Sequence, residues 1–296
     1  MVAIDALLRK VGDDPASVAS FSVDDITTVL RAVRPVFRDE AALVEVDGSV
    51  AFVGDLHGDF PTAKAILQRF LSCDHVVFLG DYIDREPVRW GSIFAIVYLL
   101  ALKCWFPRKI VLLKGNHECQ YLIPCWPYEF EEELVERFGP SELHQRFVEV
   151  FAEMPLMVMA HGVFASHGGI VKGADTQQLR HLDKNDVAAV ESLVWSDPAL
   201  SLTYRGLGDR FDADELRRFL EAVHAKVLLR GHDYATLGCS IYDDSCVTIF
   251  SSQRYMGEGN KGILVARVDH EVSHGRNLRV EDFSSGEWLP YTVKKL

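Results

Sequence analysis

The stretch HVVFLGDYIDR, residues 75–85, joins an apolar run to a polar loop. Valine and phenylalanine are typical of a buried strand, and the glycine that follows them allows the chain to turn sharply. SVAFVGD at residues 49–55 and KIVLLKGN at residues 109–116 have the same form. The three stretches predict three buried strands, each with polar side chains at its carboxyl end.

Helical sequence separates these strands, namely PTAKAILQRFL at residues 61–71 and GSIFAIVYLLALKC at residues 91–104. Strands that alternate with helices in this way predict a parallel sheet, in which ligands bind at the carboxyl ends of the strands. Further strand-like runs occur near residues 156–159, 163–166, 226–232, 240–250 and 262–268, and further helical runs near residues 128–138, 141–151 and 212–223. We therefore expect a single mixed α/β domain, preceded by a helical segment at residues 1–45 that packs on it.

Composition narrows the class of protein. The chain has 296 residues, of which 48% are hydrophobic, and this is enough for one large core. A net charge of −12 with no basic stripe argues against binding of nucleic acid. The six cysteines form no C-x-x-C pair, and no apolar run approaches eighteen residues. We expect a cytoplasmic protein that does not associate with a membrane.

Polar side chains collect at the ends of the predicted strands. They are Asp55 and His57 in GDLHGD, Asp81, Asp84 and Arg85 in GDYIDR, Asn116, His117 and Glu118 in GNHE, His167 in SHGG, and Arg230 and His232 in RGH. Each motif alone is weak, because an aspartate after a strand often caps a helix. Together they supply carboxylate, imidazole and amide donors, the mixture that suits manganese, iron or zinc. Paired metal ions can clamp the attacking and leaving oxygens of an in-line displacement.

These five motifs, in this order, resemble the signature of the phosphoprotein phosphatase family, the metal-dependent serine/threonine phosphatases of the calcineurin-like metallophosphoesterase superfamily. The similarity runs from about residue 49 to residue 268, and LVWSDP (193–198) and FSSQRYMGE (250–258) extend it. The resemblance implies a central β-sandwich of mixed sheets flanked by helices. It also implies that residues 46–296 form the catalytic domain.

The resemblance also assigns roles to the motif residues, with a hydroxide that bridges two divalent metal ions attacking phosphorus directly. One metal would be bound by Asp55, His57 and Asp81, and the other by Asp81, Asn116, His167 and His232. His117 would act as the general acid and Asp84 would orient it. The phosphate would be bound by Arg85, Asn116, Arg205 and Tyr255, with Arg210 as the alternative to Arg205. Manganese is the metal expected in vitro, with iron or zinc as alternatives.

Several positions depart from the family pattern. Glu86 replaces the usual glycine, and two interpretations stay open: a solvated acid that points away, or a partner of Arg85 or Arg89 that weakens the grip on phosphate. Met256 stands where many members have cysteine. We expect Glu118 to brace its loop, and Arg230 to have a structural role.

The expected substrates are phosphoserine and phosphothreonine proteins, with regulatory proteins as further partners. An alternative is a nucleotide hydrolase of the diadenosine-tetraphosphatase type, which uses the same dimetal core. A nuclease and a non-catalytic phosphate-binding protein are also open. The WSDP segment and the Tyr255 loop favour the phosphatase, the acidic net charge argues against a nuclease, and the intact ligand motifs argue against a non-catalytic protein.

Overall fold

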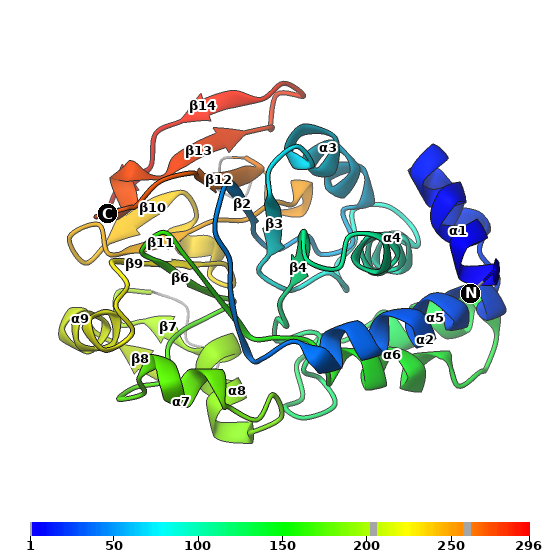
Figure 1. Ribbon diagram of the computed structural model, residues 1–296, viewed down its shortest axis with the longest axis horizontal. Helices are drawn as coiled ribbons and strands as arrows, with labels where there is room; N and C mark the ends of the chain where they lie inside the picture. The colour runs from blue at the N-terminus through cyan, green and yellow to red at the C-terminus, as the bar shows by residue number, and fades with distance from the viewer. Residues whose placement is uncertain (1, 202–205, 257–261) are drawn as a thin grey trace.

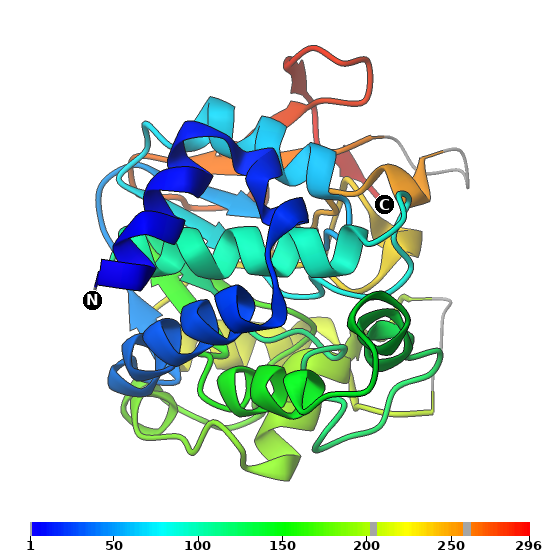
Figure 2. The same ribbon diagram turned by 90° about the vertical axis from the view of Figure 1, so that its right-hand side faces the viewer.

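Two β-sheets pack face to face in the middle of the molecule, and helices cover both outer faces (Figures 1 and 2). The computed structural model describes residues 2–201, 206–256 and 262–296. Within these residues, no helix combines the length and apolar character that crossing a bilayer would require.

The first sheet contains the strands predicted from the three quoted stretches. Its six strands run in the order β14-β13-β12-β2-β3-β4. Their bounds are β2 (Val50–Val53), β3 (His75–Phe78), β4 (Ile110–Leu112), β12 (Leu264–Val268), β13 (Arg279–Asp282) and β14 (Leu289–Tyr291). Strands β2, β3 and β4 are parallel, with Val50 opposite His75 and Val76 opposite Ile110. The predicted parallel pairing is therefore confirmed, and the carboxyl ends of these three strands lie at the same edge of the sheet.

The second sheet is also mixed and has the order β1-β5-β6-β9-β11-β10-β15. Its strands are β1 (Leu43–Glu45), β5 (Met157–Ala160), β6 (Val163–Ser166), β9 (Val227–Arg230), β10 (Cys239–Ile241), β11 (Cys246–Thr248) and β15 (Lys294–Lys295). A small two-stranded sheet is formed by β7 (Asp197–Pro198) and β8 (Arg210–Phe211). Both strands come between β6 and β9 in the sequence.

The alternation of side chains in β2 shows how the layers form. Val50 and Phe52 pack in the cluster shared with the second sheet, whereas Ala51 and Val53 pack in the cluster formed with the helices. All four are fully buried. A strand covered on both faces has no polar positions, which explains the continuous apolar runs in the sequence.

The helices divide between the two outer faces. Those on the side of the first sheet are α1 (Val2–Asp13), α2 (Val23–Asp39), α3 (Phe60–Phe70), α4 (Gly91–Trp105), α5 (Phe130–Phe138) and α6 (Leu143–Phe151). Those on the side of the second sheet are α7 (Thr176–Arg180), α8 (Val187–Trp195) and α9 (Ala213–Ala222). Short 3-10 turns complete the set: η1 (Pro15–Ser20), η2 (Tyr234–Thr236), η3 (Gln253–Tyr255) and η4 (Gly275–Asn277).

The N-terminal helices α1 and α2 pack with the other helices that cover the first sheet. Helix α2 begins at a capping box in which Ser22 and Asp25 bond reciprocally to backbone N–H groups. Its buried face, including Val33 and Phe37, packs against α4 and α6, and α1 also contacts α4 (Figure 2). The expectation that residues 1–45 are helical with short breaks was wrong at β1. Its three residues are held by pairing with β5, a long-range contact that leaves no local signal.

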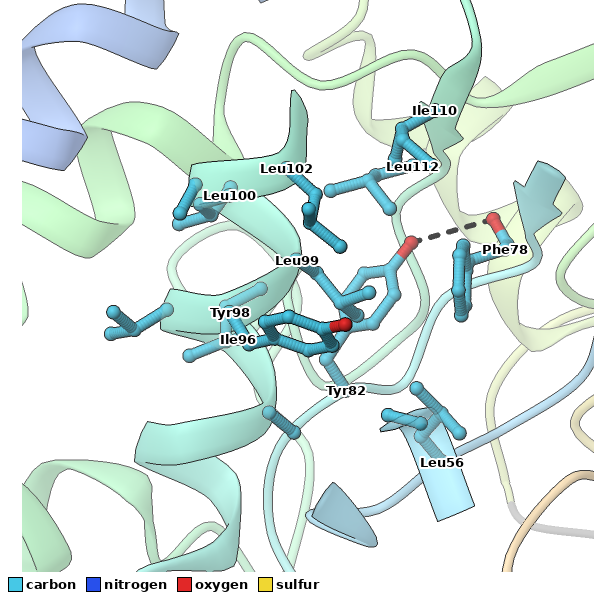
Figure 3. Close-up of a cluster of buried hydrophobic side chains, with 14 of the residues drawn as sticks. Leu56, Phe78, Tyr82, Ile96, Tyr98, Leu99, Leu100, Leu102, Ile110 and Leu112 are labelled. Carbon is cyan, nitrogen blue, oxygen red and sulfur yellow. Dashed lines mark hydrogen bonds between the residues drawn. The ribbon is translucent and has the colours of Figure 1, made fainter. Parts of the chain in front are cut away.

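Tyr82 anchors the GDYID loop to this layer. Its ring lies among Leu56, Leu99 and Leu112 in a buried apolar cluster (Figure 3). The hydroxyl donates to the carbonyl oxygen of Leu113 at 2.8 Å, so the polar end of the ring is satisfied although the residue is fully buried. The loop that carries Asp81 and Asp84 is thereby fixed to the helical layer.

Candidate metal centre and phosphate pocket

Loops from both sheets converge at one edge of the sandwich. Asp55 and His57 follow β2, Asp81 follows β3, Asn116 and His117 follow β4, His167 follows β6, and His232 follows β9. Each of these side chains is at most 4% exposed. The structure therefore brings together all the described residues to which the sequence assigned metal binding, together with His117.

The backbone at this edge adopts conformations that are uncommon for residues other than glycine. Five residues have positive φ values between 43° and 65°, namely His57, Asp81, Asp84, Arg85 and His232. Such conformations cost free energy and cluster at functional sites. The glycines permit close approach: a Cβ on Gly115 would lie 2.2 Å from Asp81 Oδ1, and one on Gly231 would lie 2.0 Å from Asp55 Oδ1.

His57 shows why the cluster fits a metal ion. Its Nδ1 donates to the carbonyl oxygen of Ile83 at 3.0 Å, so Nε2 carries the lone pair. This Nε2 lies 3.5 Å from Asp81 Oδ2 and 3.9 Å from Asp55 Oδ2. Burial lowers the pKa of His57 well below its ordinary value, so a proton does not bridge these acceptors. A divalent cation between them would satisfy the imidazole and both carboxylates.

The second half of the cluster repeats this arrangement. His167 Nδ1 donates to the carbonyl oxygen of Leu79 at 3.0 Å, and its Nε2 lies 3.4 Å from Asp81 Oδ2. Asn116 Oδ1 lies 3.1 Å from His167 Nε2 and 3.0 Å from His232 Nδ1.

Asp81 lies between the two halves. The groups His57–Asp81–His117 and Asp81–His167–His232 each bring their ligand atoms within 4.8 Å of one another, and Asp81 is common to both. This is the position that a carboxylate shared by two ions requires. Burial raises the pKa of Asp55 to about 6, an effect that a neighbouring cation would reverse.

His117 and Asp84 form a buried pair beside these donors. His117 Nδ1 bonds Asp84 Oδ2, while Asp84 Oδ1 accepts from the N–H groups of Glu129 and Phe130, both at 2.8 Å, at the start of α5. His117 Nε2 is buried, lies 4.0 Å from Asp81 Oδ2, and has no hydrogen-bond partner among the described residues. Burial alone would lower the pKa of His117, but the charges of Asp81 and Asp84 outweigh it and raise the pKa well above its ordinary value.

A pocket of 540 Å³ opens over the cluster. Its lining includes Asp81, Asn116 and His232, as well as Arg85 and Tyr255. Arg85 donates to the hydroxyl of Tyr255 at 3.0 Å. The cation and the phenol that the sequence assigned to phosphate binding therefore share one wall of the pocket.

The late loop that carries Tyr255 is tied to the first motif. Asp59, the last residue of GDLHGD, accepts from the backbone N–H of Gln253 at 2.7 Å, and it also caps α3 through Thr62. One buried carboxylate thus sets the position of Tyr255 relative to Asp55 and His57.

The other sequence-predicted residues lie as follows. Arg205 falls outside the described residues. Arg210 is exposed on β8 and is not among the residues that line the pocket. Arg230 is fully buried and binds the backbone of Gly168 and the carboxylate of Asp197, in agreement with a structural role. Glu118 accepts from the N–H groups of Asp81, Tyr82 and Gly115, which braces the loop.

Neither interpretation of Glu86 was right. Its side chain is half-buried, and it accepts from Ser92 Oγ at 3.1 Å. Arg85 binds Tyr255 instead, and Arg89 binds Glu136 at 2.7 Å. The stem of Glu86 packs over Gly58, where a Cβ would lie 2.4 Å from the Cβ of Glu86.

Sequence reasoning missed several residues of the pocket, among them Cys125 and Trp126. Cys125 Sγ lies 3.8 Å from His117 Nδ1, and Trp126 is 90% exposed at the rim. Both stand in the segment LIPCWPY, which has neither strand nor helix periodicity and matches no motif. A tryptophan nine residues after the candidate catalytic histidine was the available signal.

Comparison with known proteins agrees with the fold and the site. The family model described as calcineurin-like phosphoesterase matches residues 48–235. A serine/threonine-protein phosphatase of Caenorhabditis elegans is 28% identical over 281 residues, which is 87% of this chain and 60% of that relative's length. The serine/threonine-protein phosphatase 4 catalytic subunit of Kluyveromyces lactis is 28% identical over 263 residues, covering 84% of each chain.

A solved structure is similar over most of the chain. It is a protein serine/threonine phosphatase from Saccharomyces cerevisiae, described as similar to human phosphatase PP5. It matches with a TM-score of 0.74 and 23% identity, covering 84% of this chain and 83% of that chain. The likeness confirms the expected fold.

The sandwich and the donor cluster at its edge define a metal-dependent hydrolase. The chain belongs to the calcineurin-like phosphoesterase family, whose model covers more than half of its length. The family expected from the motifs is thereby confirmed.

Proposed function

We propose that this protein is a serine/threonine phosphoprotein phosphatase. The observation that carries the proposal is the His117–Asp84 pair: the buried Nε2 of His117 lies 4.0 Å from Asp81 Oδ2 and has no hydrogen-bond partner among the described residues. The named relatives in Caenorhabditis elegans and Kluyveromyces lactis support this substrate class.

The residues around Asp81 would hold two divalent ions, one by Asp55, His57 and Asp81 and the other by Asp81, Asn116, His167 and His232. When bound, such ions neutralise phosphate charge and lower the pKa of water, so that hydroxide is available near neutral pH. Oxygen and imidazole donors suit manganese, iron or zinc, and we propose manganese for activity in vitro.

His117 would give the proton on Nε2 to the leaving serine or threonine oxygen. Asp84 holds the ring in the required orientation and stabilises the imidazolium. Because α5 fixes Asp84 through two N–H groups, the pair is oriented before substrate binds.

Arg85 would bind the phosphate oxygens, because a planar guanidinium can make two parallel bonds to them. Tyr255 holds Arg85 in place through its hydroxyl. Asn116 and Arg205 are proposed as further phosphate ligands.

The domain bounds, the further partners and the cellular location are also proposals. Residues 46–296 would form the catalytic domain, with residues 1–45 packing on it and regulatory proteins as further partners. A cytoplasmic location is supported by the six cysteines, all of which are unpaired.

A panel of substrates tests the proposal. The purified protein with manganese is incubated with a phosphoserine peptide, a phosphothreonine peptide, a phosphotyrosine peptide, diadenosine tetraphosphate and single-stranded DNA. We expect hydrolysis of the first two at the highest kcat/KM. Activity on the nucleotide alone would favour the diadenosine-tetraphosphatase alternative and overturn the proposal.

A further inference from the structure

A second groove adjoins the phosphate pocket. It has a volume of 520 Å³ and shares Arg85, Pro127 and Arg254 with the pocket. Five of its lining residues are glutamates: Glu86 from the GDYIDR loop, and Glu129, Glu132, Glu133 and Glu136 from the start and body of α5. The groove therefore extends the phosphate site along an acidic wall.

The five glutamates outnumber the three arginines that also line the groove, Arg85, Arg89 and Arg254. Arg89 pairs with Glu136, and Arg85 binds Tyr255. Within the described part of the chain, no lysine or arginine forms an ion pair with the other four glutamates. Arg137, one turn after Glu133, donates to the backbone of Ala19 and stacks on Phe94.

Glu133 is the central residue of the groove. It is 7% exposed, and its Oε2 is buried with no hydrogen-bond partner among the described residues. Its Oε1 has a long contact, 3.5 Å, with the N–H of Ile93, and the side chain of Ser92 also interacts with the Glu133 carboxylate. A buried carboxylate oxygen without a donor is costly and indicates a missing cationic or donor group.

Glu86 adds to this deficit. Its carboxylate bonds Ser92 Oγ from the loop side of the groove. Burial, and then the charge of Glu86, raise the pKa of Glu133 to about 8. A positively charged side chain placed in the groove would favour the ionised form of Glu133 and lower this pKa.

We propose that this groove binds a lysine or arginine side chain of the substrate, a few residues away from the phosphorylated serine or threonine. The inference rests on the proposed function and names its preferred class of substrate, basic phosphopeptides. An extended chain advances about 3.3–3.6 Å per residue, so a long basic side chain can reach from the phosphate pocket into the adjoining groove.

Matched phosphopeptides test the inference. One phosphoserine peptide has alanine at the three positions on each side, and a series places a single arginine or lysine at each position in turn. For the wild-type protein, we expect at least one basic position to raise kcat/KM about tenfold, which corresponds to 1.4 kcal/mol.

Variants on α5 locate the effect. We expect Glu132→Gln and Glu133→Gln each to reduce the preference, and the double variant to bring the ratio of basic to neutral peptide near one. Glu131→Gln is the matched control, because Glu131 lies in the same helical turn but is not a lining residue of the groove, and its carboxylate lies 3.8 Å from His144 Nδ1 instead. Glu132 is exposed, so its variant keeps the test valid if Glu133→Gln unfolds.

p-Nitrophenyl phosphate separates this inference from the proposed function, because it has no peptide to reach the groove. Equal kcat/KM for neutral and basic peptides in an active wild-type protein would overturn the inference alone. An equal loss of preference in Glu131→Gln would also overturn it. Failure to hydrolyse any phosphopeptide while p-nitrophenyl phosphate is cleaved would overturn the proposed function and this inference together.

Discussion

The metal centre and the rim of the phosphate pocket differ in how the chain holds their side chains. Asp81 is 2% exposed, and its backbone N–H is bonded to Glu118, which also braces Gly115. Trp126, at the rim, is 90% exposed. The centre is fixed by strands, glycines and buried hydrogen bonds, whereas the rim is built on loop sequence. Loops on a rigid scaffold can change without loss of the centre.

The largest expected effect is at the centre. Asp81→Asn removes one charge from the carboxylate that both halves of the cluster share. We expect kcat to fall by at least on the order of 10²–10³, together with loss of bound metal measured by elemental analysis. Asp243→Asn is the control, since Asp243 is fully exposed and also has a positive φ of 53°. Full metal content in Asp81→Asn would contradict the bridging position.

The next effect separates proton donation from metal binding. His117→Asn should lower kcat on a phosphoserine peptide by about 10²-fold, the lower end of the usual contribution of a general acid. The loss should be much smaller on p-nitrophenyl phosphate, whose leaving group needs no proton. Steady-state kinetics on both substrates give the comparison. An equal loss on the two substrates would show that His117 acts in another way.

At the rim, a smaller and selective change is expected. Trp126→Ala should raise KM for phosphopeptides by a few fold, because a large exposed ring beside the phosphate is lost, while KM for p-nitrophenyl phosphate stays the same. The melting temperature should not change, since substitutions at exposed positions usually alter stability by less than about 0.5 kcal/mol. A lower metal content in this variant would break the distinction between centre and rim.

The smallest effect is a dependence of stability on pH. Glu133 has a folded-state pKa of about 8, raised by burial and then by Glu86, with Asp84 adding to it and Arg137 one turn away. Between its unfolded pKa and pH 8 the folded state binds the extra proton, so wild-type stability falls as pH rises. The Glu133→Gln variant has no carboxyl group at this position, so its stability should not fall with pH for this reason.

The melting temperature of Glu133→Gln relative to wild type should therefore rise by on the order of several degrees between pH 5 and pH 8. Differential scanning fluorimetry in matched buffers measures it, with Glu131→Gln as the reference. A difference that is constant over this range would mean that Glu133 is ionised in the folded protein throughout.

The contrast between centre and rim also explains what the sequence could predict. The strands that carry Asp55, Asp81 and Asn116 are buried on both faces, so their apolar runs and terminal glycines were visible in the sequence. Parallel pairing then placed these side chains at one edge. Their common location was therefore predictable from residue pattern alone.

Other features depended on long-range packing. The strand β1 is defined by its pairing with β5, and α7 and α8 were not predicted from the sequence because their short segments have weak periodicity. Cys125 and Trp126 come near His117 through an irregular segment. The partner of Glu86 was missed because Ser92 belongs to the next helix and carries no motif.

Helix α5 has a consequence for how this enzyme can change. The N–H groups of its N-cap Glu129 and its first residue Phe130 bind Asp84, which aligns the proposed proton donor, and three of its glutamates line the groove proposed to select substrate. A substitution that shifts the helix to suit a new target sequence would also shift the partner of His117. The proposed selectivity and the turnover rate therefore both depend on one helix of nine residues. Mutations that leave its backbone in place are the ones that can alter selectivity alone.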